Sequence, residues 1–278
     1  MMKKNILLPT DFSDNAWSAA VYALKLYEDQ SCTFYFLHSS KLKASAMSNM
    51  SNKLVRVMAE NATKELNELK EMAENSNTNA NHKFEIILST NDLYDAIEAT
   101  IEKRKIDLVV MGTKGATKAT DIVFGSNTVN VIKKIKGCPV MAIPDEFDFV
   151  KPEQIAFPTD FNRFYGEELV PLKRLADLFN SKIRVMHINI KDDITEAQDY
   201  NLDQLKLALE DYLHSFHWLP DYDKKHEVIK EFIDELNINI LVMINYKRSF
   251  IESIIKEPVI KKLGFQLAIP FLVIPCSG

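Results

Sequence analysis

The sequence predicts an α/β chain of two similar domains, each built on a parallel sheet with helices on both faces. Short apolar segments alternate with longer amphipathic segments, which is the pattern of strands joined by crossover helices. The segment ILLPTDFS at 6–13 recurs as IAFPTDFN at 155–162. His38 and His187 recur with the same separation as these two segments, so we infer that the chain arose by duplication of one unit.

The two periodicities predict the strands and helices of the first copy. Apolar runs predict strands at 5–8, 34–37, 84–88, 108–111 and 140–143. Amphipathic spacing predicts helices at 13–27, 54–72 and 93–103, and a fourth helix that begins near Ser126. The apolar residues of the helix at 54–72, including Met58 and Met72, are expected in the core.

The second copy repeats this order in a shorter segment. Its predicted strands are 155–158, 183–188, 216–219 (a shortened strand), 240–244 and 271–274. Its predicted helices are 169–179, 196–213 and 223–236. Met111 and Met243 occupy equivalent places in the two fourth strands, but fewer residues separate them than separate His38 from His187. The second copy has therefore lost residues between its second and fourth strands. The segment 145–152 is expected to link domains at 1–146 and 147–278.

Charge and composition argue against several classes of function. The net charge of -5 gives no basic surface for nucleic acid, and no apolar stretch reaches the roughly 18 residues that span a bilayer. The three cysteines are widely spaced, as expected for free thiols in a reducing compartment. The six histidines show no zinc-binding spacing. We therefore expect a soluble, cytoplasmic protein with no nucleic acid or membrane partner and no metal held by protein alone.

The segment after the predicted strand at 108–111 has the composition of a phosphate-binding loop. Gly112, Gly115 and Gly125 lie in this segment, and Ser126 then opens a helix. Glycines let backbone N–H groups approach a ligand closely, and a helix N-terminus presents unpaired N–H donors to an anion. The simpler alternative is that these glycines only form turns, but their combination after a buried strand favours phosphate binding.

The spacing of the loop resembles the nucleotide-binding signature of universal stress proteins, Gly-2x-Gly-9x-Gly-Ser/Thr. Gly112, Gly115, Gly125 and Ser126 match all four positions, whereas the P-loop and dinucleotide-binding signatures are absent. The resemblance implies two Rossmann-like domains of the adenine nucleotide alpha-hydrolase-like type, each a five-stranded parallel sheet of order 3-2-1-4-5. It also implies binding of ATP or a related adenine nucleotide, alone or with Mg²⁺.

The implied strand order brings the ends of the first, second and fourth strands to one edge of the sheet, where ligands bind in such folds. On this basis the nucleotide-binding residues are expected to be Pro9, Thr10, Asp11, Ser39, Met111, Gly112, Gly115, Gly125, Ser126, Asn127 and Thr128.

Several of these residues also have a structural interpretation. The resemblance implies that Asp11 lies near the ribose or a cation, but an aspartate here can equally cap the next helix, and Asp160 occupies the same place in the second copy. The resemblance puts the backbone of Ser39 near the adenine. Ser126 and Thr128 could donate hydroxyl hydrogen bonds to phosphate or cap their helix.

The second copy has lost the loop. When the fourth strands are aligned on Met111 and Met243, Gly112 aligns with Ile244, and the segment 245–259 contains no glycine. We therefore predict that the second copy does not bind a nucleotide in the manner of the first.

A binding function is favoured over catalysis. No nucleophile motif, carboxylate pair or general base is recognisable, so we expect at most a weak ATPase activity. The leading hypothesis is a stress-response protein that uses its nucleotide to regulate assembly or an unknown protein partner. The alternatives are an adaptor with a vestigial loop and a very slow ATP hydrolase. The resemblance implies an internal pseudo-dimer through the strands at 140–143 and 271–274, and further homo-oligomerisation stays open.

Overall fold

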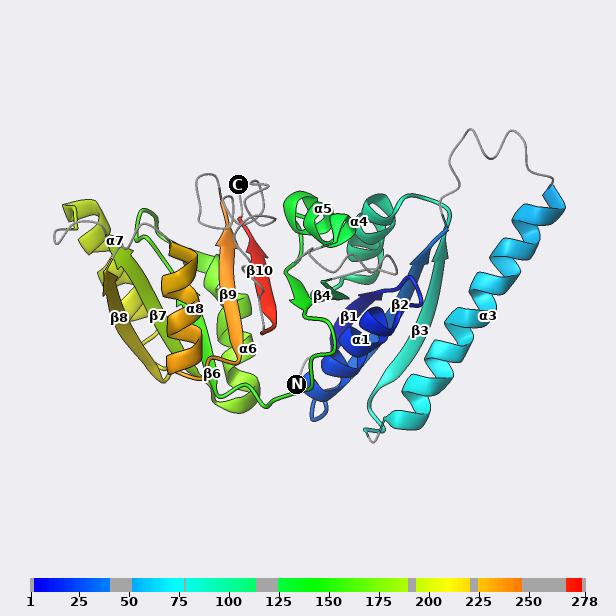
Figure 1. The fold of residues 1–278 in the computed structure, drawn as a ribbon, viewed down its shortest axis with the longest axis horizontal. Helices are drawn as coiled ribbons and strands as arrows, with labels where there is room; N and C mark the ends of the chain where they lie inside the picture. The colour runs from blue at the N-terminus through cyan, green and yellow to red at the C-terminus, as the bar shows by residue number, and fades with distance from the viewer. Residues whose placement is uncertain are drawn as a thin grey trace. The chain divides into compact units, whose positions relative to one another are not determined.

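The structure, a computed structural model, describes residues 3–40, 52–77, 79–113, 125–189, 194–220, 225–246 and 269–276 (Figure 1). Contacts between residues group the chain into two compact units, Met1–Phe149 and Val150–Gly278.

The first unit is a parallel sheet whose described strands lie in the order β3-β2-β1-β4-β5. The strands are β1 (Lys4–Pro9), β2 (Cys32–Ser39), β3 (Lys83–Ser89), β4 (Leu108–Gly112) and β5 (Val140–Ile143). The helices are α1 (Asp14–Leu26), α3 (Asn52–Ser76), α4 (Leu93–Arg104) and α5 (Ser126–Lys134). The predicted strand order is confirmed, and the winding of the sheet therefore reverses between β1 and β4.

The core of the first unit lies on both faces of β1. Ile6 is opposite Phe34 of β2 on one side and Leu108 of β4 on the other, and Ile6 and Leu7 are fully buried. Helix α1 contacts β4, while α3 contacts β2 and β3. Burial on both faces is why these strands are apolar runs rather than alternating ones.

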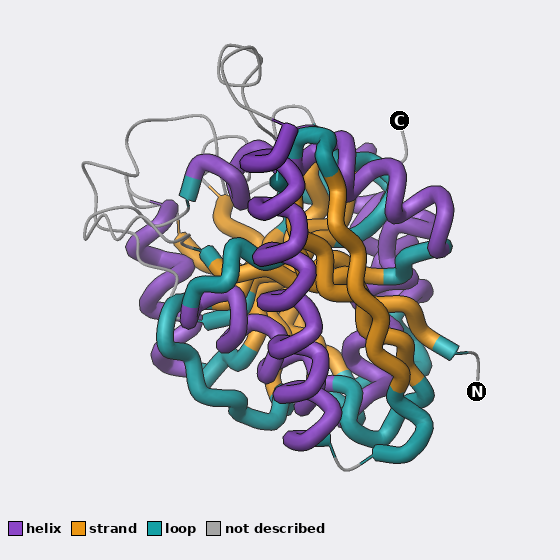
Figure 2. The backbone as a smooth tube through the Cα atoms, turned by 90° about the vertical axis from the view of Figure 1, so that its right-hand side faces the viewer, coloured by secondary structure: helices purple, strands orange, loops and turns teal. Residues whose placement is uncertain are grey.

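Helix α3 departs from the prediction that its apolar residues face the core. Leu66 is fully buried against the sheet, but Leu54, Met58 and Met72 are 46%, 39% and 48% exposed. The helix has 25 residues and is about 37 Å long, whereas the seven residues of β3 span about 23 Å. The N-terminal part of α3, with Leu54 and Met58, therefore diverges from β3 (Figure 1). Met72 lies in the part that covers the sheet, but it is off the buried face, to which its neighbour Ala73 belongs. Figure 2 shows the helix from its outer side, in front of the strands.

The second unit repeats the topology, with its described strands in the order β8-β7-β6-β9-β10. The strands are β6 (Gln154–Pro158), β7 (Lys182–Asn189), β8 (His214–Pro220), β9 (Ile240–Asn245) and β10 (Phe271–Pro275). The helices are the 3-10 helix η1 (Gly166–Leu169), α6 (Val170–Phe179), α7 (Glu196–Ala208) and α8 (Lys225–Glu235).

Two boundaries in the second unit were predicted wrongly. Helix α7 ends at Ala208 instead of Leu213, because the N–H of Leu209 bonds to the carbonyls of Leu205 and Lys206 and the chain then turns. Strand β8 is consequently seven residues long, not shortened, and pairs with β7 along its whole length.

The strand registers locate the shortening of the second copy. The pairs Ile6–Phe34 and Ile155–Ile183 have the same spacing along the chain, so nothing is lost between the first two strands. Phe34 pairs with Phe84 between the second and third strands of the first unit, and Ile183 pairs with His214 in the same way in the second unit. More residues separate the first pair along the chain than the second pair. The loss therefore lies between the second and third strands, where a helix of 25 residues in one unit corresponds to one of 13 in the other.

Two composition-based expectations can be compared with the described residues. No helix in these parts of the chain is both long and apolar enough to cross a membrane. All three cysteines are free thiols, with Cys32 and Cys138 buried and Cys276 partly exposed.

We predict that Leu66→Ala lowers the free energy of unfolding of the first unit by about 2–4 kcal/mol, because it leaves a cavity under α3. The exposed Met72→Ala is the matched control and should change it by less than about 0.5 kcal/mol. Urea denaturation in a Trp218→Phe background, with Trp17 as the remaining tryptophan, measures the first unit. Equal losses in both variants would contradict the described packing of α3.

The buried thiols predict a loss of stability at alkaline pH. Burial, aided by the carboxylate of Asp107, raises the pKa of Cys32 and of Cys138 from 9.0 to about 12. Above pH 9 the unfolded chain releases these protons while the folded chain keeps them, so stability falls as pH rises from 9 towards 12.

Denaturation between pH 8.5 and pH 10.5 should give a shallower pH dependence for Cys138→Ala than for the wild type, by up to about 1.4 kcal/mol per pH unit. An unchanged slope would show that this thiol ionises equally in both states.

Candidate functional site

Ten of the eleven predicted site residues lie in the described part of the chain; the other, Gly115, is outside it. Pro9 ends β1 and is followed by Thr10 and Asp11, Ser39 ends β2, and Met111 and Gly112 end β4. Because these three strands are adjacent and parallel, their carboxyl ends meet at one edge of the sheet. The other four residues lie at the start of α5.

The turn after β1 is fixed by the main chain and by one histidine. The N–H of Thr10 donates to the Leu37 carbonyl at 2.8 Å, and the hydroxyl oxygen of Thr10 accepts from the N–H of Phe12 at 3.0 Å. Nδ1 of His38 lies 2.9 Å from the Thr10 carbonyl, so this nitrogen carries the proton. These bonds hold Phe12 in the left-handed region at φ 65°.

Asp11 has a structural role whatever it does towards a ligand. It is exposed, and its Oδ1 accepts from the N–H of Ser13 at 3.2 Å and from the Ser13 hydroxyl at 2.6 Å. Oγ of Ser13 in turn accepts from the N–H of Ala16 as the N-cap of α1. Asp11 thus supports the cap rather than being the cap itself, and its role near a ribose or cation stays a prediction.

The same turn is present in the second unit, which has no glycine loop. Oγ1 of Thr159 accepts from the N–H of Phe161, and Nδ1 of His187 donates to the Thr159 carbonyl at 2.9 Å. Oδ1 of Asp160 accepts from the N–H of Asn162, and Phe161 has a φ of 54°. The PTDF sequence and its histidine are therefore features of the fold, as the repeat indicates.

The end of β4 and the start of α5 are joined by two hydrogen bonds. The N–H of Gly125 donates to the Thr113 carbonyl at 2.5 Å, and the Thr128 hydroxyl donates to the Gly112 carbonyl at 2.8 Å. Thr128 is almost fully buried. Its hydroxyl therefore has a structural partner in the Gly112 carbonyl, and a role of Thr128 towards phosphate stays a prediction.

The N-terminus of α5 is open to a ligand. Its N-cap is Gly125, so Ser126 is the first helical residue instead of the cap that the sequence allowed. The first main-chain bond within the helix is donated by Val129, and Ser126 and Asn127 are exposed. Because the first N–H groups of a helix have no intrahelical acceptor, this end attracts anions.

Ser39 approaches the same edge from β2. Its hydroxyl donates to the Asn91 carbonyl at 2.7 Å, which joins the end of β2 to the turn between β3 and α4. Because the Ser39 hydroxyl is used in this way, an adenine base would contact the main chain of Ser39. The hydrogen bond to Asn91 does not test whether adenine binds beside Ser39.

The equivalent edge of the second unit carries side chains that the sequence pattern did not reveal. The hydroxyl of Tyr246 donates to Oδ1 of Asp160 at 2.8 Å, and the amide of Gln198 donates to the Asp160 carbonyl at 2.9 Å. Burial raises the pKa of Tyr246, so it stays a neutral donor. Tyr246 follows β9 by one residue, but a single tyrosine in a loop gives no signal that it would contact Asp160.

Arg163 forms a second side-chain cluster beside Asp160. Its guanidinium donates two hydrogen bonds to the buried Glu168 carboxylate, at 2.8 and 2.7 Å, and a third to Sγ of Cys276. The guanidinium also lies over the ring of Tyr246. These contacts place the side chains of Arg163 and Tyr246 beside Asp160, and the absence of a nucleotide from this unit stays a prediction.

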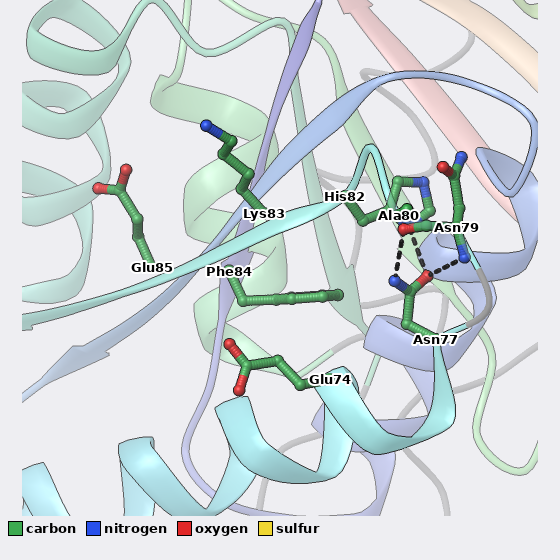
Figure 3. A pocket seen from close by; sticks show the side chains of 8 residues that line it. All are labelled: Glu74, Asn77, Asn79, Ala80, His82, Lys83, Phe84 and Glu85. Atoms are coloured by element: carbon green, nitrogen blue, oxygen red, sulfur yellow. Dashed lines mark hydrogen bonds between the residues drawn. The ribbon is translucent and has the colours of Figure 1, made fainter.

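A pocket of about 490 Å³ lies at the opposite edge of the first sheet, between the end of α3 and the start of β3 (Figure 3). His82 closes one side of it, with Nδ1 2.6 Å from the Asn77 side-chain oxygen. The lining residues are Glu74, Asn77, Asn79, Ala80, His82, Lys83, Phe84 and Glu85. The amino end of β3 is far from the residues of the motif, so this pocket is separate from the predicted site.

A protein-only metal site is not found in the described ranges, where no three His, Cys, Asp or Glu side chains could hold a metal ion together.

Comparisons with known proteins agree with this architecture. The sequence profile of the universal stress protein family matches residues 2–144, just over half of the chain. Two universal stress proteins of Methanocaldococcus jannaschii are 27% and 28% identical over 143 and 160 residues, which are about half of this chain and 81% and 96% of those proteins.

A solved structure extends the likeness to both units. The crystal structure of a universal stress protein from Archaeoglobus fulgidus aligns with 98% of this chain and 96% of its own, with a TM-score of 0.70 and 18% identity. At that identity the likeness concerns the fold.

We predict that Thr128→Val lowers the stability of the ligand-free protein by about 1–3 kcal/mol, since it leaves the Gly112 carbonyl without its donor. The exposed Ser126→Ala is the control and should change stability by less than about 0.5 kcal/mol. Urea denaturation without nucleotide measures both. A Thr128→Val protein of wild-type stability would instead favour a hydroxyl that serves only a ligand.

Proposed function

Because the chain belongs to the universal stress protein family, we propose that its first unit binds ATP or a related adenine nucleotide at the carboxyl edge of the sheet. The observation that supports this most strongly is the open N-terminus of α5, which begins at the third glycine of the motif and lies beside the end of β4. The phosphates would lie at Gly112, Gly125, Ser126 and Asn127.

The chemistry of these residues suits a polyphosphate. The first turn of α5 contains no acidic residue, so nothing in it opposes the partial positive charge of the helix end. Exposed Ser126 and Asn127 can add side-chain donors to the N–H groups. In our proposal Mg²⁺ would be carried by the phosphates and not by a dedicated protein cage, as is usual for that ion.

The rest of the nucleotide is assigned to the two neighbouring strand ends. Asp11 is exposed at the end of β1, and we propose that it faces the ribose while it also supports the cap of α1. The main chain at Ser39 would border the adenine. Met111 and Pro9 are buried and form the floor beneath.

We propose regulation by occupancy instead of turnover. The carboxylate best placed near the ligand, Asp11, is already bonded to Ser13, which suits a structural support better than a base aimed at water. The bound state would then act on assembly or on a protein partner in the cytoplasm. The second unit, where Tyr246 contacts Asp160, would take part without a nucleotide of its own.

The decisive experiment measures nucleotide binding in two variants of nearly equal size, of which only one adds a negative charge. Ser126→Asp places a carboxylate at a helix N-terminus, which the helix tolerates well, yet it repels a phosphate. Ser126→Asn gives a side chain of the same size as aspartate without the charge. Calorimetry with ATP, with and without Mg²⁺, should give one site per chain in the wild type and in Ser126→Asn, and an affinity at least about tenfold weaker in Ser126→Asp.

Release of nucleotide from the freshly purified, denatured protein, followed by mass spectrometry, identifies the ligand that the cell supplies.

The calorimetry also decides between the proposal and its alternatives. The absence of saturable heat with ATP, ADP or AMP in the wild type would refute the proposal and favour the adaptor alternative. Two sites per chain would contradict the assignment to the first unit alone. Steady phosphate release would favour the slow hydrolase.

A further inference from the structure

Asn15 is a buried polar residue next to the motif that the sequence did not single out. It is the second residue of α1, close after the cap formed by Ser13, and is only 5% exposed. Helix α1 lies against β4, so the side chain of Asn15 reaches the end of that strand. There it meets Gly112, the first glycine of the motif.

The space that a side chain would need at Gly112 is taken by Asn15. A Cβ built on Gly112 would overlap Oδ1 of Asn15, and it would lie 2.6 Å from Cγ and 3.0 Å from the main-chain oxygen of the same residue. Contacts that short are not tolerated between a Cβ and buried groups. Gly112 is the last residue of β4 and does not have a left-handed φ, so space, not conformation, requires the glycine.

The position of Gly112 determines where α5 begins. Its carbonyl accepts the Thr128 hydroxyl, and the next residue, Thr113, bonds to Ile143 of β5 and to the N–H of Gly125. A shift of Gly112 away from α1 would therefore move the open end of the helix.

The second unit provides an internal comparison. The counterparts of Asn15 and Gly112 in the aligned copies are Phe164 and Ile244. Phe164 is 57% exposed and lies before the first helical turn of its unit, and Ile244 is buried. Both members of the pair thus differ in the copy that lacks the glycine loop.

We propose that Asn15 is a positioning residue of the nucleotide site, and that the first glycine of the motif is required because Asn15 fills its side-chain space. Gly112 would then serve the contact with α1 in addition to its place beside the phosphates. This inference rests on the proposed function of the first unit.

The test is a double-mutant cycle on Asn15 and Gly112, read by ATP affinity and by melting temperature. Gly112→Ala should weaken ATP binding at least about tenfold, because the added methyl group displaces β4 from α1. Asn15→Ala should weaken it about threefold to tenfold by releasing Gly112. The Asn15→Ala background removes the two closest contacts, those with the side-chain amide, and leaves the main-chain oxygen at 3.0 Å, so Gly112→Ala should add less than about twofold there.

Gly137→Ala is the matched control, because among the described residues a Cβ there meets only Ile101, at 3.9 Å. It should leave affinity and melting temperature unchanged. Equal weakening by Gly112→Ala in both backgrounds would show that the ligand, and not Asn15, requires this glycine. An Asn15→Ala protein with wild-type affinity would also overturn the positioning role.

Failure of the proposed function is distinguishable from failure of this inference. A wild type that binds no nucleotide refutes the function and with it the role of Asn15 towards a ligand. The melting temperatures still decide the contact, since Gly112→Ala should lower the melting temperature in the wild-type background and much less in the Asn15→Ala background.

Discussion

The two hydrogen bonds that join the end of β4 to the start of α5 set the geometry on which the candidate site depends. In both bonds the acceptor is a carbonyl at the end of β4, of Gly112 or of Thr113, and the donor belongs to the start of α5. The N-terminal end of α5 is therefore held against the sheet by residues outside the loop that connects them. The turn after β1 is fixed in the same way by main-chain bonds and one histidine. Both of these borders of the site are thus held in place by the fold itself, before any ligand binds.

The duplication separates what the fold needs from what a ligand needs. The PTDF turn and its histidine keep the same hydrogen bonds in both units, at 2.9 Å from the histidine nitrogen to the threonine carbonyl in each. The glycine positions do not persist, and Tyr246 contacts the aspartate in the second unit. A residue present in both copies is therefore better explained by the needs of the strand and turn. A residue present in one copy only is better explained by a ligand site.

Strand positions, sheet order and the edge that carries the motif were predictable, because buried parallel strands are short apolar runs and the motif follows one of them. Side-chain directions were not. The spacing of Leu54 and Met58 fits a buried helix face, but only the lengths of α3 and β3 show that the sheet ends before them. The sequence does not show whether the Thr128 hydroxyl faces a ligand or the Gly112 carbonyl. No sequence pattern marked Asn15, because the residue that it contacts is a glycine far along the chain.

One feature of the chain, a glycine loop in only one of two otherwise similar units, constrains how steeply it can respond. Two identical subunits in a symmetric dimer carry two equivalent sites, whose coupling can sharpen a response to concentration. A fused pair with one such loop lacks that partner site within its own chain. On the proposed function, the occupancy of a single chain would follow a simple hyperbola, and a steeper, threshold-like response would need contacts between chains.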